Sequence, residues 1–181
     1  MNTVSGTVVT QQAGGGNAWT NDTQAKIEDS NYADVALFGS DASDYLNTEP
    51  YGGLAALPSR AIIPVIEVQV LLYADVGDIS MISEMYLTES GVIQTGVRDA
   101  GKPIQTSPGW GDKGSYCGSA TDLWDISAAS MKSLIQQKHF GVLFLVSEFT
   151  GSPVNIFVDD TRINVFYTIP LRVRCLAGCG R

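Results

Sequence analysis

Several short stretches of the chain alternate apolar and polar residues with a period of two. In 65–73 (VIEVQVLLY), Glu67 and Gln69 point to one face, and the other face is apolar: Ile66, Val68, Val70 and Leu72. The same period recurs in 30–40 and in 81–91. In 81–91 it predicts one face made of Met81, Ser83, Met85 and Leu87. Successive side chains of a β-strand point to opposite faces, so this period predicts strands that bury one face.

Other stretches lack this clean alternation. Residues 139–149 (HFGVLFLVSEF) are apolar on both faces and predict a central strand. Residues 154–169 predict two strands, separated by a turn at Asp159-Asp160-Thr161. Proline and glycine in 44–64 predict turns and a loop that crosses a sheet edge, and 99–121 predict a long loop.

Residues 125–138 (DISAASMKSLIQQK) are the helical candidate. Ser127 is suited to cap the first turn, and Met131, Leu134 and Ile135 fall on one stripe. Strands dominate, and no strand–helix–strand alternation is visible. The sequence therefore predicts an all-β fold, a two-layer antiparallel β-sandwich that is jelly-roll-like, with one short helix and extended termini.

The predicted elements divide the chain into three segments. Residues 1–16 are rich in Thr, Val, Gln and Gly, and we expect a flexible arm with a short strand at most and a glycine hinge. Residues 17–168 form the sandwich domain. Residues 169–181 form a C-terminal tail that carries arginine and cysteine: Arg172, Arg174, Cys175, Cys179 and Arg181.

Composition narrows the function. The chain has 181 residues, a formal net charge of −8 and one histidine, His139. A protein with this negative charge repels phosphate backbones and anionic lipid. We therefore expect neither nucleic acid nor membrane as a partner. The single histidine and the lack of hydrolase, phosphate-loop or dinucleotide motifs predict a protein that is not an enzyme and binds no cofactor or metal. No secretory signal is expected at the N-terminus.

Large aromatic residues lie in the predicted loops. The stretch 116–127 (YCGSATDLWDIS) holds Tyr116 and Trp124, and Trp19 and Trp110 lie in similar Gly-, Asn- and Ser-rich surroundings. One hypothesis is structural, with Trp124 filling the open end between the sheets and Tyr116 shaping the turn. The alternative is an exposed aromatic platform that stacks against sugar.

An ordered series of short motifs resembles a β-sandwich module of tailed-phage virion proteins and their prophage relatives. The matching residues are Trp19, Tyr32-Ala33, Tyr51-Gly52, 58–62, 65–70, Tyr116, 121–124, 140–142, Val158-Asp159 and 163–168. The chain departs from the pattern at Cys117 and Pro64, where the pattern has glycine. The matched residues belong to core and turns, so the resemblance brings no catalytic residue with it.

The resemblance implies a structural subunit of a virion, of the capsid decoration, neck or tail accessory type, assembled in the host bacterial cytoplasm. Its expected partners are other virion proteins, such as the major capsid, neck or tail protein, and further copies of itself in a homo-oligomer. The alternative is a lectin-like module that binds carbohydrate or a receptor on a virion or cell surface. Exposed aromatic side chains in a cleft would favour this alternative, and buried ones would oppose it.

Acidic residues supply two weaker candidate sites. Asp159-Asp160, together with Asp122 and Asp125, raise the question of calcium, but the chain has no tight Asp-rich loop, and turns and caps explain these residues. A second set lies on or beside strands: Glu67, Glu84 and Glu148. Two such carboxylates could act as acid and base, but the polar face of an antiparallel strand gives the same pattern.

The C-terminal tail has its own hypothesis. Arg172, Arg174 and Arg181 would dock the tail on an acidic neighbour. Cys175 and Cys179, with Cys117 as a third point, would then form intermolecular disulfides. A local disulfide and a frayed terminus with free thiols remain alternatives.

Overall fold

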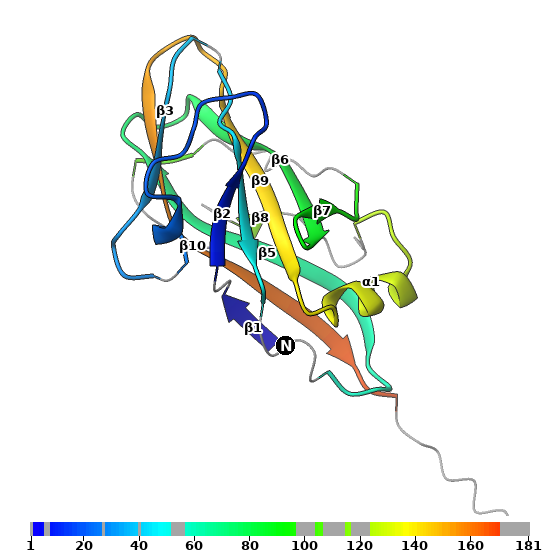
Figure 1. Cartoon of the computed structure of the whole chain (residues 1–181). Helices are drawn as coiled ribbons and strands as arrows, with labels where there is room; N and C mark the ends of the chain where they lie inside the picture. Colours follow the sequence, from blue (N-terminus) through cyan, green and yellow to red (C-terminus); the bar gives the residue numbers. More distant parts are fainter. Residues whose placement is uncertain are drawn as a thin grey trace, which may run out of the picture.

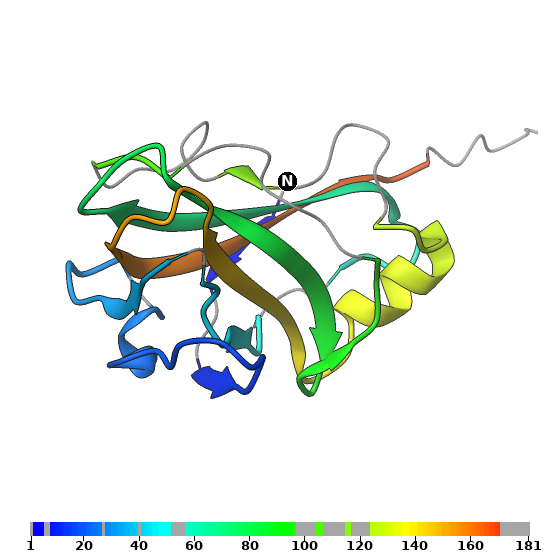
Figure 2. The same ribbon diagram turned by 90° about the horizontal axis from the view of Figure 1, so that it is seen from above.

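The computed structural model describes residues 2–5, 8–26, 28–39, 41–51, 57–96, 104–106, 115–116 and 124–170. Two antiparallel sheets pack against each other, which confirms the predicted all-β sandwich (Figures 1 and 2). Within the described residues, sheet A consists of β1 (Asn2–Ser5), β3 (Ala33–Leu37), β5 (Ile62–Ala74), β8 (Ser115–Tyr116) and β10 (Val154–Thr168). Sheet B consists there of β2 (Val8–Gln12), β4 (Tyr45–Glu49), β6 (Ser80–Glu89), β7 (Val92–Ile93) and β9 (Phe140–Glu148).

The long strand β10 organises sheet A because it has neighbours on both sides. β5 pairs with one side of β10. On the other side, β3 pairs with residues 154–158 and β1 pairs with residues 162–165. In sheet B the order is β2-β4-β9-β6-β7. β9 is therefore central and is buried on both faces, which confirms the prediction for 139–149.

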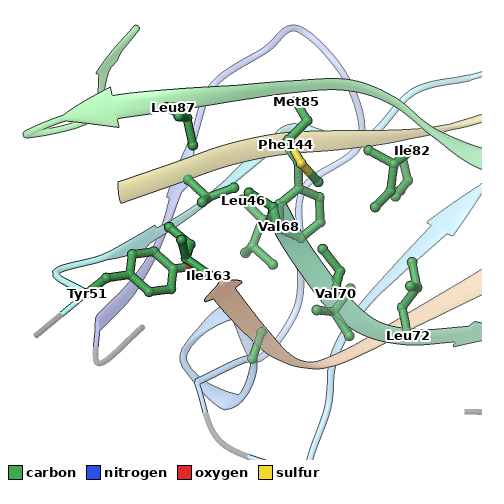
Figure 3. Packing of buried hydrophobic residues seen from close by; sticks show 14 of the residues in the cluster. Leu46, Tyr51, Val68, Val70, Leu72, Ile82, Met85, Leu87, Phe144 and Ile163 are labelled. Carbon is green, nitrogen blue, oxygen red and sulfur yellow. The ribbon is translucent and has the colours of Figure 1, made fainter. Parts of the chain in front are cut away.

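The core lies between the two sheets (Figure 3). Sheet A contributes the four apolar residues predicted for one face of 65–73, and all are fully buried: Ile66, Val68, Val70 and Leu72. Facing side chains of sheet B include Leu46, Met85 and Phe144. Glu67 and Gln69 are only half-buried, as the alternation predicts. Fully burying such an apolar side chain contributes about 1.5–3 kcal/mol, so this layer is the main source of stability.

Strand β6 departs from the predicted alternation. Its pairing with β9 shifts register after Ile82 and leaves Ser83 as an extra residue, a β-bulge. Ile82 therefore joins Met85 and Leu87 in the core, whereas Met81 and Ser83 are half-buried. The predicted face is wrong in its first half because one inserted residue inverts the order of inward and outward positions.

Strand β10 contains no turn. The predicted break at Asp159-Asp160-Thr161 is wrong, since the strand continues through these residues with a β-bulge between Val158 and Asp160. Asp159, Asp160 and Thr161 are all buried. Their polar composition is typical of a turn, but partners from the loop before β3 and from Arg162 allow the two carboxylates to remain within the sheet.

The stretch 44–64, predicted as turns at a sheet edge, begins with a strand in the interior of sheet B. β4 lies between β2 and β9. Its buried residues are Leu46, Asn47 and Thr48, so the apolar alternation that marks a strand is missing. The peptide between Glu49 and Pro50 is cis, and Tyr51 packs against Phe140 with ring centroids 6.2 Å apart.

Residues 1–16, for which the sequence predicts a flexible arm, contain two strands in the structure. β1 pairs with β10, and β2 pairs with β4 in the other sheet. The backbone N–H groups of Gly14 and Gly16 donate to Asp44 Oδ1 at 2.9 and 3.1 Å. A Cβ on Gly16 would lie 2.3 Å from the Ala42 carbonyl oxygen, so glycine is required here for close approach. This segment therefore contributes one strand to each sheet of the sandwich.

The predicted helix is confirmed as α1 (Ala128–Ile135), which lies at one end of the sandwich (Figure 2). Ser127 Oγ accepts a hydrogen bond from Ser130 N at 3.1 Å and caps the first turn. The predicted stripe is buried: Met131, Leu134 and Ile135. Lys132 Nζ donates to the carbonyl of Ala61 at 3.0 Å and to that of Ser59, which ties the helix to the segment before β5.

Candidate functional site

Trp124 and Trp19 lie in the interior. The indole N–H of Trp124 donates to the Ile66 carbonyl at 3.2 Å, and the whole residue is buried. The indole N–H of Trp19 donates to the Asp44 carbonyl at 2.7 Å, and its ring meets Phe144 edge-on. Neither ring has an open face on which a sugar could stack.

The remaining predicted aromatics are described only in part. Tyr116 is in β8, where its backbone pairs with Val68 of β5. Trp110 lies outside the described residues, as do Cys117, Cys175, Cys179, Arg172, Arg174 and Arg181. The docking role of the arginines and the disulfides of the cysteines therefore stay predictions.

The three strand glutamates are held by different structural partners. Asn164 Nδ2 donates to Glu67 Oε2 at 2.9 Å across sheet A. Glu148 is buried and accepts the backbone N–H groups of Thr150 and Gly151, so it shapes the turn after β9.

On sheet B, Glu84 Oε2 accepts hydrogen bonds from the hydroxyls of Tyr45 at 2.6 Å and Tyr86 at 2.9 Å. Burial, and then the hydrogen bond to Glu84, raise the pKa of both tyrosines. Glu67, Glu84 and Glu148 thus engage separate groups, and no two of them share an acid–base arrangement.

Ion pairs and charged hydrogen bonds of Asp159, Asp160 and Arg162, which we call the ionic seam, lie along the outer side of β10. Asp159 accepts the backbone N–H groups of Asp29 at 3.2 Å and Ser30 at 3.3 Å. Arg162 Nε donates to Asp160 Oδ2 at 3.0 Å, and its Nη2 donates to Glu28 Oε2 at 2.7 Å. These bonds anchor the loop before β3 on β10, which has neighbouring strands on both sides.

Burial raises the pKa of Asp159 above the usual aspartate value, and the carboxylates of Asp29 and Glu28 add to this rise. The two backbone N–H donors act in the opposite direction but do not cancel it. Within the described residues, no group of three or more His, Cys, Asp or Glu side chains is arranged to hold a metal ion. Asp125 is exposed, and Asp122 lies outside the described part of the chain.

An aromatic cluster on the outer face of sheet A was missed in the sequence. Tyr73 of β5 and Phe157 of β10 are cross-strand partners, and their rings stack with centroids 4.7 Å apart. Tyr32 stands edge-on to both, at 5.2 Å from Tyr73 and 6.1 Å from Phe157. All three are half-buried. The sequence signal was that Tyr73 and Phe157 occupy outward positions of their strands, where polar residues are usual.

A second feature, which we call the apolar end, was also missed. Three loops meet at the upper end of Figure 1: the segment after β3, the β5–β6 turn and the β9–β10 turn. The N–H of Phe149 donates to the Ile79 carbonyl at 3.1 Å, and that of Glu148 donates to the Asp41 carbonyl at 2.9 Å. Each loop exposes one large apolar side chain, to 58%, 44% and 45%: Phe38, Val76 and Phe149.

Comparison with known proteins adds no relative: the chain matches no family model and no curated protein sequence. Within the described residues, no helix has both the length and the apolar character that crossing a membrane requires. The function must therefore be argued from the sandwich and its surface.

Proposed function

We propose that this chain is a non-enzymatic structural subunit of a phage virion, of the capsid decoration, neck or tail accessory type, that binds neighbouring virion proteins and copies of itself. The ordered motif series supports this proposal. Among its described members, Trp19, Tyr51 and Trp124 are buried core residues, as expected for a structural motif.

The observation that carries the proposal is the apolar end. Phe38, Val76 and Phe149 are exposed on separate loops, and backbone hydrogen bonds join the β9–β10 turn to the β5–β6 turn and the end of β9 to the segment after β3. Exposed apolar surface at one place, rimmed by polar residues, is typical of a protein–protein contact. Nearby carboxylates of Asp41, Asp75 and Asp78 supply such a rim, so the proposed partner presents apolar residues flanked by polar or basic ones.

The lectin-like alternative loses the two tryptophans that the structure describes. Trp19 and Trp124 are buried, so their rings cannot form a platform for sugar. The structural proposal is therefore preferred.

The test is the location of the chain. Phage particles are purified from a host culture that carries the gene for this chain in its natural genome. Mass spectrometry of these particles should detect the chain. A variant with Phe38→Ser, Val76→Ser and Phe149→Ser should be lost from particles while remaining folded. The matched control is Val92→Ser with Ile93→Ser, which removes exposed apolar side chains from β7 and should be incorporated normally.

Two outcomes would contradict the proposal. The first is a chain that is absent from particles and found only as a free monomer. The second is a triple variant that enters particles as well as the wild type, which would show that the apolar end makes no contact there.

A further inference from the structure

A pocket of about 400 Å³ opens beside the aromatic cluster of sheet A. Its aromatic lining residues are Tyr32 and Phe157, and the ring of Tyr73 stacks on that of Phe157. Its remaining walls are polar: Asn21, Gln24, Ser30, Asn31 and Asp34. Aromatic residues beside a few polar groups are typical of small-molecule sites, and the shallow, open shape of this pocket suits a ligand that lies against a surface.

The pocket walls are fixed to the sheet. Thr20 and Asp34 exchange two backbone hydrogen bonds, of 2.7 and 2.9 Å, which join the segment before η1 (Asp22–Gln24) to β3. Asp159 of β10 accepts the backbone N–H groups of Asp29 and of Ser30, and Ser30 is a lining residue. The site is therefore preformed, which lowers the entropic cost of binding.

The polar lining residues have side chains of the kind that bind hydroxyl groups. Asn21 Nδ2 donates to Asp34 Oδ1 at 3.2 Å, which orients both side chains at the rim. The side chains of Gln24, Ser30 and Asn31 make no hydrogen bond with any residue that the structure describes. The pocket thus offers amide donors, amide and carboxylate acceptors and one hydroxyl directly beside aromatic rings.

We propose that this pocket binds a neutral saccharide. A pyranose has an apolar C–H face, which packs on the ring of Tyr32 or Phe157, and a hydroxyl edge, which exchanges hydrogen bonds with Asn21, Gln24 and Asn31. This site does not depend on the proposed virion role or on the buried tryptophans.

Other ligand classes fit less well. A phosphorylated ligand would be repelled by Asp34, by nearby Glu28 and Asp29, and by the net charge of −8. A quaternary ammonium would be attracted to the rings and to Asp34, but it offers no acceptor to the amide N–H groups of Asn21, Gln24 and Asn31. A neutral sugar uses both the rings and the amides.

The experiment uses the whole chain. A glycan array first identifies the saccharides that bind, and saturation-transfer NMR with the corresponding monosaccharides then measures affinity. The pocket is open on one side, so we expect dissociation constants of about 1 mM for single sugars. Tyr32→Ala should weaken binding about tenfold or more, whereas Tyr32→Phe should keep the stacking surface and change it only about twofold.

Two further variants guard against a loss of fold. Gln24→Ala and Asn31→Ala remove side chains that make no bond with described residues, so they should leave the thermal midpoint unchanged while weakening binding several-fold. The matched control is Tyr86→Ala, which removes a ring from the other aromatic pair, Tyr45–Tyr86 on sheet B, and should bind as the wild type does.

Saccharide binding that falls in the pocket variants and persists in Tyr86→Ala supports the proposal. The proposal is overturned if no saccharide on the array binds, or if binding survives both Tyr32→Ala and Gln24→Ala. It is equally overturned if tetramethylammonium, and no sugar, perturbs the Tyr32 ring, since the pocket would then be a cation site.

Discussion

The two faces of the β5–β10 pair belong to the same strands but differ in how they are built. The inner face is mainly apolar: Val68 and Val70 of β5 lie opposite Ile163 and Thr161 of β10, and Thr161 is the polar exception among these four. The outer face combines a stack of aromatic rings with an ionic seam. Inner residues meet the opposite sheet, whereas outer residues meet loops.

This difference shows which positions of the fold require a particular partner residue. Any apolar residue of suitable size satisfies an inner position, because burial is non-directional. An outer position needs a particular partner: Asp159 is paired with the backbone of Asp29, 130 positions away in the chain. The inner face therefore supplies stability and the outer face supplies the pocket and its geometry.

The largest effect should come from removing a ring of the core, compared with removing a ring of the outer face. Phe144→Ala, on the inner face of sheet B, should lower the free energy of unfolding by about 3–5 kcal/mol because the residue is fully buried. Phe157→Ala, on the outer face of sheet A, should cost roughly 1–2 kcal/mol, since that ring is half-exposed and loses mainly its stack on Tyr73. Chemical denaturation measures both. Equal costs would mean that the outer face is as tightly packed as the core.

A smaller effect concerns pH. The folded state raises the pKa of Asp159, so between the usual carboxyl pKa and this higher value the folded state holds more protons than the unfolded state. Asp159 therefore makes stability fall as pH rises through that window. Asp159→Asn should remove this component, so its stability relative to the wild type should improve across the same window.

The measurement is the urea midpoint of both proteins from about pH 3 to pH 7. Thr161→Val, two residues further along the same strand, is the control because it changes no titratable group. Parallel pH profiles for wild type and Asp159→Asn would refute the role assigned to burial of this carboxyl.

The smallest effect is expected at Thr161 itself. Its hydroxyl is buried and has no hydrogen-bond partner in the described part of the chain. A valine of the same shape would remove this polar atom from the inner face, so Thr161→Val should leave stability unchanged or raise it by up to about 1 kcal/mol. A loss larger than about 1 kcal/mol in thermal or chemical denaturation would show that the hydroxyl has a favourable contact.

Local periodicity predicted the inner face well. The strands within 30–40 and 65–73, the central strand β9 and the capped helix α1 all occur where the sequence indicates them. Each depends on near neighbours in the chain: alternation of apolar residues, a continuous apolar run or a serine cap.

Predictions failed where a distant segment supplied the missing partner. β4 has little apolar alternation, yet it is a strand because β2 and β9 hydrogen-bond to its two sides. Asp159 and Asp160 resemble a turn, yet they continue β10 because the loop before β3 and Arg162 satisfy their carboxylates. The candidate sugar pocket was also missed, because its lining residues Tyr32 and Phe157 come from segments far apart in the chain.

The sequence by itself determined that this chain forms short strands with one apolar face, one capped helix and a sandwich core, because those features follow from the order of neighbouring side chains. Only the tertiary structure decided which strands pair, where the bulges in β6 and β10 invert the alternation, and which outward residues meet. The reason is physical. Burial depends on the character of a residue, whereas hydrogen bonds, ring stacking and register depend on which distant residue lies opposite.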